Sequence, residues 1–171
     1  MKFRFCDLSL LIIIGGDVLT LKYRYLDHMT DAIVEAFGDT LEEAFANAAE
    51  GLVNMMFEIP VDKNSKSFKK DLDVKITTNI VARGYDLKSL LYEWLEKVLL
   101  IIYIDKLIPL KYDFIIFNTE ADFFIEASVQ TDKINLKKYL YKLEVKSITY
   151  HEMDIRKLSD NRYSIKYLVD L

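Results

Sequence analysis

The stretch YLDHMTDAIVEAFGDTLEEAF, residues 25–45, places an acidic turn, a short strand and a capped helix in direct succession. Residues 21–26 and 31–37 read as short strands on either side of the acidic turn. Thr40 opens a capping box in which its hydroxyl and the Glu43 carboxylate satisfy free amides at the helix start. Apolar residues then recur every three or four positions to about Phe57, so this helix has one apolar face.

The periodicities that follow predict more strands and one more helix. Alternation over residues 72–82 predicts a half-buried strand, and Asp86 is a helix N-cap before an apolar stripe that runs to Val98. Further strands are expected over residues 112–117, 121–129, 143–149 and 163–169. Because strands outnumber helices and connections are short, we expect an α+β fold. Its arrangement should be a two-layer sandwich, a mixed and mostly antiparallel sheet with two main helices packed on one face.

The composition of the chain limits which classes of protein it can belong to. The chain has 171 residues, enough for one compact domain, and 51% of them are hydrophobic, too many for a disordered chain. A formal net charge of −4 argues against binding dominated by nucleic-acid phosphates. Lysines gather at residues 66–70 and 133–142, and we interpret both groups as solvated surface. A single cysteine, Cys6, cannot form an intrachain disulfide, which fits a reducing compartment.

Residues 1–20 differ from the rest and are treated as an N-terminal extension of a domain over residues 21–171. The apolar residues 8–14 follow Lys2 and Arg4, as in a signal peptide, but Gly15-Gly16-Asp17 is a poor cleavage site. The apolar run is also too short to cross a bilayer. The alternatives are an additional edge strand and a misplaced start of the gene.

The candidate chemistry lies in carboxylates. The sequence contains no glycine-rich phosphate loop and no Gly-x-Ser-x-Gly motif, and its two histidines and one cysteine are too few for a tetrahedral zinc site. Asp27 and Asp31 stand four apart around a turn, and Asp170 ends the last predicted strand. If the first and last strands are neighbours, Asp31 and Asp170 face each other and repel unless a cation compensates them. A hard ion such as Ca²⁺ accepts carboxylate and main-chain oxygens together. Taken alone, Asp31 fits a turn-capping or surface aspartate better than a metal ligand.

Three segments resemble the archease family, small accessory proteins of the RtcB-type tRNA-splicing ligase. Residues 27–31, DHMTD, resemble the family's opening Asp/Glu-His-Thr-Ala-Asp signature, and residues 146–153, KSITYHEM, resemble its second signature. The sequence VDL at residues 169–171 resembles the family's acidic and then aliphatic ending. Met29-Thr30 departs from the usual Thr-Ala, which changes the loop without removing a ligand position. The resemblance implies a two-layer α/β arrangement.

The resemblance also implies the site residues. Asp31, Asp170 and Leu171 correspond to the family's metal ligands, with Ca²⁺ the expected ion, while Asp27 and His28 belong to the signature. Two interpretations of His28 remain open, a group that orients a metal-binding carboxylate and a buried structural histidine. We interpret His151 and Glu152 as a solvent-facing pair where a strand ends.

The function implied is that of an activator, not a catalyst. The protein would promote guanylylation and multiple turnover of an RtcB-type ligase that joins tRNA exon halves, in the cytoplasm or also the nucleus. Strong direct nucleic-acid binding and membrane association are not expected. Two alternatives stand beside this one. A chaperone-like binding module would need an extended exposed apolar patch. A metal-dependent phosphoester hydrolase using Asp27, His28 and Asp31 would need a substrate pocket and an open coordination position.

Overall fold

The computed structural model describes residues 13–14, 17–18, 21–27, 31–60, 76–120 and 122–171. The helices within these ranges are α1 (Leu41–Met56) and α2 (Leu87–Tyr103). The strands are β1 (Ile13–Ile14), β2 (Asp17–Val18), β3 (Tyr23–Asp27), β4 (Ala32–Gly38), β5 (Phe57–Glu58), β6 (Ile76–Gly84), β7 (Leu107–Asn118), β8 (Phe123–Lys133), β9 (Leu140–Tyr141), β10 (Ser147–Lys157) and β11 (Tyr163–Asp170).

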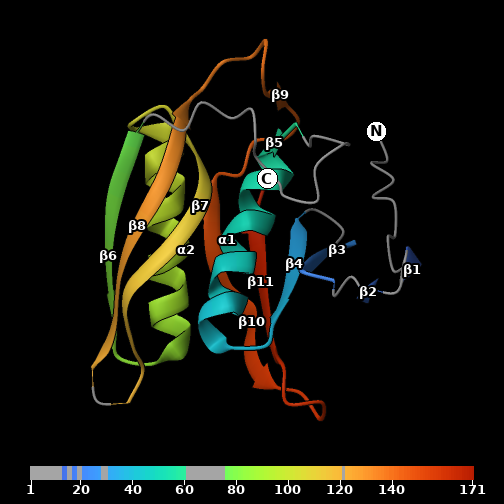
Figure 1. Ribbon diagram of the computed structural model, residues 1–171, viewed down its shortest axis with the longest axis vertical. Coiled ribbons are helices and arrows are strands. Elements are labelled where there is room, and N and C mark those ends of the chain that lie inside the picture. Colours follow the sequence, from blue (N-terminus) through green and yellow to red (C-terminus); the bar gives the residue numbers. More distant parts are fainter. Residues whose placement is uncertain (1–12, 15–16, 19–20, 28–30, 61–75, 121) are drawn as a thin grey trace.

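Within the described residues, the two helices pack against two larger sheets, and β1-β2 and β5-β9 form two small two-stranded sheets (Figure 1). One larger sheet has the strand order β10-β11-β4-β3 and the other has the order β6-β8-β7. Every pairing between described strands is antiparallel. Helix α1 packs on the four-stranded sheet and runs beside β7, whereas α2 packs on the three-stranded sheet and runs beside β10. The expected α+β class is confirmed. The strands form two main sheets with one helix each, in place of one sheet that carries both helices.

Both helix starts follow from their capping residues. The Thr40 hydroxyl accepts a hydrogen bond from the Glu43 amide at 3.1 Å, and the Glu43 carboxylate accepts one from the Asp39 amide at 2.8 Å. Asp86 caps α2 by accepting from the Ser89 amide at 2.7 Å, and Ser89 completes a capping box. These contacts satisfy amides that a helix start leaves free, so the predicted helix starts are confirmed.

Tyrosines of the four-stranded sheet hold α1 in place. The Tyr25 hydroxyl donates to the Gly51 carbonyl and the Tyr167 hydroxyl donates to the Ala48 carbonyl, each at 2.8 Å. Gly51 lets the helix approach this closely, because a Cβ there would lie 2.9 Å from Val34 Cγ1. The two helices are joined by the buried Trp94, whose indole donates to the Phe45 carbonyl at 3.1 Å.

Three elements differ from the sequence prediction. Helix α2 continues past Val98 to Tyr103, because Leu99, Ile101 and Ile102 remain buried. Strand β7 begins earlier than predicted and includes Pro109, which an outer strand tolerates. Strand β10 begins later than predicted and runs through His151 and Glu152 to Lys157, with a register shift that interrupts the alternation. Residues 72–75 of the predicted strand and most of the N-terminal extension lie outside the described residues. No described helix is long and apolar enough to span a membrane.

Replacing Trp94 with alanine should lower the free energy of unfolding by about 3–5 kcal/mol, because it empties a fully buried volume and removes the bond to α1. The matched control is Leu100→Ala on the same helix, where the side chain is exposed and the change should stay within about 1 kcal/mol. Urea denaturation of both variants measures the difference. Equal losses would show that the Trp94 bridge does not hold the layers together.

Candidate functional site

The pairing of β4 with β11 brings Asp31 and Asp170 together. Ala32 of β4 pairs with Val169 of β11, and this is the last pair between the two strands. Asp31 and Asp170 are the residues immediately beyond it, one on each strand. Residues opposite each other in an antiparallel pair have Cβ atoms about 4.5–5.5 Å apart. The structure therefore places these two predicted site residues at one end of the four-stranded sheet, although they are far apart in the sequence.

The Asp170 side chain belongs to the face of the sheet that points away from α1. Along β11, Tyr167 bonds to α1, and alternation puts Asp170 on the opposite face together with Lys166 and Leu168. Asp31 lies in the bend just before β4 and is half-buried. A ligand held by both carboxylates would thus approach from the outer side of the sheet.

Lys146 ties the last two residues to the start of β10. Its amide donates to the Asp170 carbonyl at 2.9 Å, and its ammonium donates to the main-chain oxygen of Leu171. Ser147, the next residue, lies directly opposite Asp170. The Leu171 oxygen is therefore held close to Asp170 and already attracts a positively charged group.

This donor set fits a hard divalent cation. Among the described residues, no three His, Cys, Asp or Glu side chains gather in a way that could hold a metal. A metal here would instead be held by the carboxylates of Asp31 and Asp170 and by the main-chain oxygen of Leu171, with water completing its shell. Such all-oxygen coordination is the preference of Ca²⁺. The Asp27 side chain and residues 28–30, with His28, lie outside the described part of the chain.

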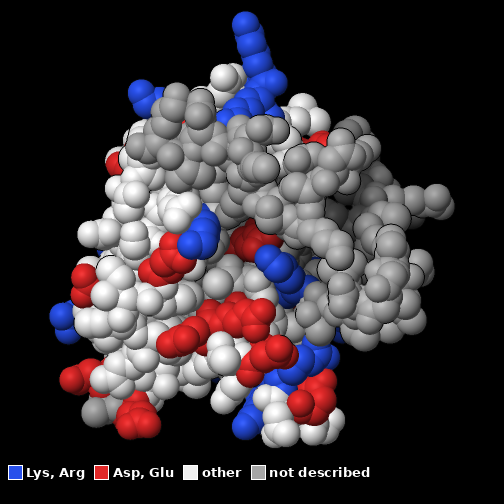
Figure 2. Space-filling model, in the orientation of Figure 1, with Lys and Arg blue, Asp and Glu red and all other residues white. Residues whose placement is uncertain are grey.

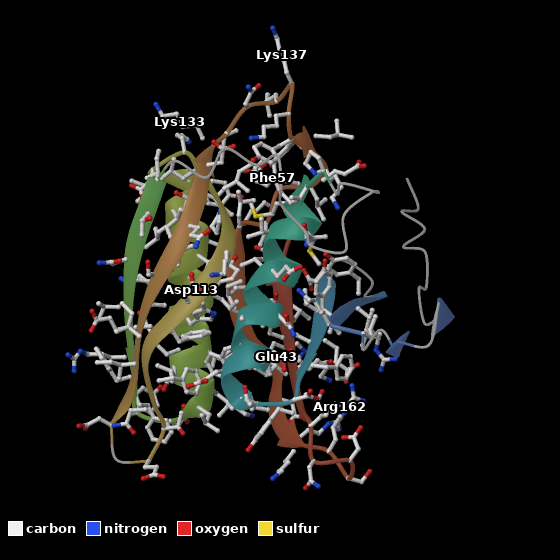
Figure 3. The ribbon with its side chains drawn as sticks, in the orientation of Figure 1. Glu43, Phe57, Asp113, Lys133, Lys137 and Arg162 are labelled. Carbon is white, nitrogen blue, oxygen red and sulfur yellow. The ribbon has the colours of Figure 1, made fainter. Side chains whose placement is uncertain are left out.

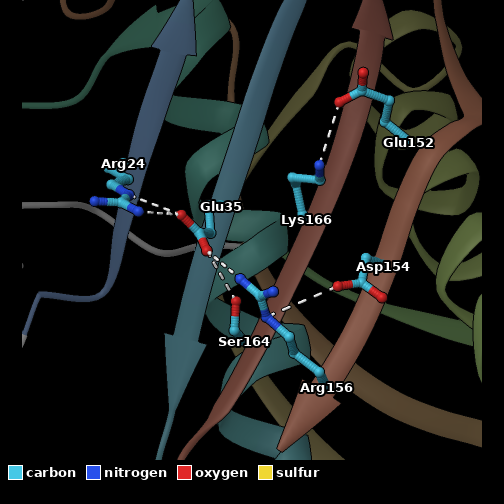
Figure 4. A network of polar contacts seen from close by, with 7 residues as sticks. All are labelled: Arg24, Glu35, Glu152, Asp154, Arg156, Ser164 and Lys166. Atoms are coloured by element: carbon cyan, nitrogen blue, oxygen red, sulfur yellow. Dashed lines mark hydrogen bonds and ion pairs between the residues drawn. The ribbon is translucent and has the colours of Figure 1, made fainter. Parts of the chain in front are cut away.

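The buried Glu35 contacts residues from the other three strands of the sheet that carries Asp31 and Asp170 (Figure 4). Glu35 on β4 accepts from Arg24 on β3 at 2.7 Å and from Ser164 on β11 at 3.1 Å. Arg156 on β10 lies 3.6 Å from the same carboxylate. Since a buried carboxylate needs such partners, Glu35 links all four strands of the sheet. Glu35 was not among the predicted functional residues; its signal in the sequence is a single glutamate inside an apolar strand.

The lysines of residues 133–142 do not form an open basic surface. Lys133 and Lys137 project at one end of the molecule (Figure 3), but Lys138 is paired with Asp132. Burial lowers the pKa of Lys142. On the face seen in Figure 2, acidic side chains are more prominent, including those at the start of α1. This distribution favours the predicted solvated surface over a phosphate-binding patch.

A cavity of about 320 Å³ lies between β3, α1 and the start of β7. Tyr23, Glu50 and Tyr112 are among its described lining residues, and the buried Tyr112 hydroxyl has no hydrogen-bond partner among the residues that the structure describes. Burial, reinforced by Glu50, raises the pKa of Tyr23 to about 12. Because Asp31 and Asp170 are absent from the described lining, this cavity gives the carboxylate pair no substrate pocket.

The fold and the site together define the class of protein. It is a small α+β domain whose candidate metal ligands, Asp31 and Asp170, lie at the ends of adjacent strands. Comparison with known proteins gives the family. Residues 23–171 match the model of the archease protein family (MTH1598/TM1083). The chain belongs to the archease family.

Relatives match along most of their length. The protein archease of Pyrococcus abyssi and that of Sulfurisphaera tokodaii are each 33% identical over 150 residues, covering 88% of this chain and 99% of theirs. The solution structure of Methanobacterium thermoautotrophicum protein 1598 superimposes with a TM-score of 0.67 at 25% identity, covering 88% of this chain and 99% of that one.

Replacing Glu35 with alanine should lower the free energy of unfolding by about 2–3 kcal/mol, because the buried carboxylate then no longer accepts hydrogen bonds from Arg24 and Ser164 on the two neighbouring strands. The control Asp154→Ala removes only an exposed pair with Arg156 and should change it by less than about 1 kcal/mol. Thermal unfolding of both variants measures the contrast. If Glu35→Ala were as stable as Asp154→Ala, the Glu35 network would not hold the sheet.

Proposed function

We propose that this protein activates an RtcB-type tRNA-splicing ligase by promoting guanylylation and multiple turnover, and that it acts without catalysing RNA joining itself. Membership of the archease family is the single observation that carries this proposal. The proposed site of action is a Ca²⁺-binding group formed by Asp31, Asp170 and Leu171. The proposed place of action is the cytoplasm or the nucleus, where such a ligase would act.

The site supports a role in binding. Its carboxylates lie at the end of a sheet, and both residues are half-exposed. A cation there would offset their mutual repulsion and give the surface a fixed shape before the partner arrives. The net charge of −4 favours encounter with a basic surface on the ligase.

The two alternatives receive less support. A hydrolase needs a pocket beside its metal, and the described lining of the cavity near Tyr23 includes neither Asp31 nor Asp170. A chaperone needs a continuous apolar surface, whereas exposed apolar residues such as Val81 and Leu136 come from separate parts of the fold.

Asp31→Asn and Asp170→Asn should each weaken Ca²⁺ binding by at least about tenfold, because each removes a charged ligand. Both variants should also lose stimulation of the cognate ligase, seen as a slower guanylylation rate and a lower turnover number with GTP and Mn²⁺. Single-turnover joining by ligase that is already guanylylated should not change. Calorimetric Ca²⁺ titration and RNA-joining assays provide the measurements.

The matched control is Asp160→Asn, an exposed aspartate in the turn at the far end of β11 that pairs with Arg162. It should bind Ca²⁺ and stimulate the ligase as the unmodified protein does. Stimulation by the Asp31 and Asp170 variants at the normal level would contradict the proposed site. RNA joining by the protein alone would contradict the accessory function.

A further inference from the structure

Strand β10 contains a bulge that presents part of the second signature to solvent. Thr149 pairs with Leu168, but the next pair is Asp154 with Lys166, so β10 carries extra residues that β11 does not match. Within this bulge Glu152 adopts the left-handed conformation with φ 55°. Tyr150, His151 and Glu152 are exposed, while Met153 returns to the core. Bulges on outer strands commonly redirect side chains in this way.

Three tyrosines from different elements meet beside the bulge. The Tyr150 ring stacks on Tyr92 of α2, with centroids 4.6 Å apart and planes within 6° of parallel. Tyr85, in the turn before α2, is 82% exposed, and after burial it is the next cause that raises the pKa of Tyr150. We call these three residues the tyrosine platform. Exposed aromatic rings with fixed orientations are typical anchors of protein interfaces.

Acidic side chains surround the tyrosine platform. Burial raises the pKa of Tyr92, and the negative charges of Glu96 and Glu93 raise it further, so both carboxylates lie near its hydroxyl. Asp86 contributes in the same way at Tyr150. Among the described residues, the positive charge of Lys88 acts on Asp86, and Lys166 pairs with Glu152 at 3.2 Å. Acids are therefore the main charged groups around the stacked rings.

This combination favours an arginine over a nucleic acid. A guanidinium can stack on a tyrosine face and pair with a flanking carboxylate at the same time. A phosphate backbone would instead meet the charges of Asp86, Glu93 and Glu96. The ligand class that fits is thus an arginine-bearing segment of a protein.

The tyrosine platform and the carboxylate pair both lie along strand β10, on opposite faces of its sheet. Ser147 lies opposite Asp170, and Tyr150 follows three residues later on the same strand, about 10 Å away. We propose that the tyrosine platform and its acidic surround are a docking surface for an arginine-bearing loop of the ligase. This inference rests on the proposed function for the identity of the partner.

The test is the dissociation constant for the cognate RtcB-type ligase. Tyr85→Ala and Glu93→Lys alter exposed or half-buried positions outside the core, and each should weaken binding about tenfold. Glu93→Lys should also reduce the salt dependence of association. The matched controls, Tyr141→Ala and Glu120→Lys, change an exposed tyrosine and an exposed glutamate elsewhere and should bind within about twofold of the unmodified protein. Normal binding by Tyr85→Ala and Glu93→Lys would overturn the inference.

A second measurement separates this inference from the proposed function. In an NMR titration, a capped peptide with one arginine should shift amides at residues 85–93 and 150–152, whereas the same peptide with citrulline should not. If the ligase does not bind at all but the arginine peptide shifts these residues, the proposed function fails and the docking surface is supported. If neither binds there, the inference is overturned. Single-stranded RNA that binds the unmodified protein but not Tyr85→Ala would also overturn it, in favour of base stacking.

Discussion

The antiparallel pairing of β4 with β11 is the constraint on which the rest of the structure depends. It joins the first long strand of the domain to the last, and it is central in a sheet whose outer strands are β3 and β10. One face of this pair carries Val34 and Tyr167 toward α1, while the other face carries Glu35 and its ionic partners. Because side chains alternate along a strand, a slip of one residue would exchange these faces. The same register sets Asp31 beside Asp170.

Local signals made the helices predictable. Thr40 and Asp86 cap the helices that the apolar periodicity indicates, and capping depends only on residues a few positions apart. Strand partners were not predictable in this way, because pairing joins distant residues and no local pattern encodes it. The division into two sheets and the bulge after Thr149 were missed for that reason.

The candidate site likewise has features that local sequence indicates and features that depend on contacts between distant residues. Its carboxylates were named from the family resemblance, and their adjacency required the β4–β11 pairing. Glu35 drew no attention in the sequence, since its role exists only when Arg24 and Ser164 lie beside it. The tyrosine platform likewise combines a turn, a helix and an edge strand. Strands β10 and β11 thus carry a candidate cation site on one face of the sheet and an aromatic, acidic surface on the helix side.

Paramagnetic broadening by Mn²⁺ tests the central claim most directly, because it locates a bound cation in the intact protein. Amide signals of residues 31, 147, 170 and 171 should broaden first and recover when Ca²⁺ is added. Signals from the β7–β8 hairpin and from the turn at Asp160 should stay sharp. Broadening centred on the acidic start of α1, or spread evenly over the acidic surface, would contradict the claim that the β4–β11 pairing builds a cation site.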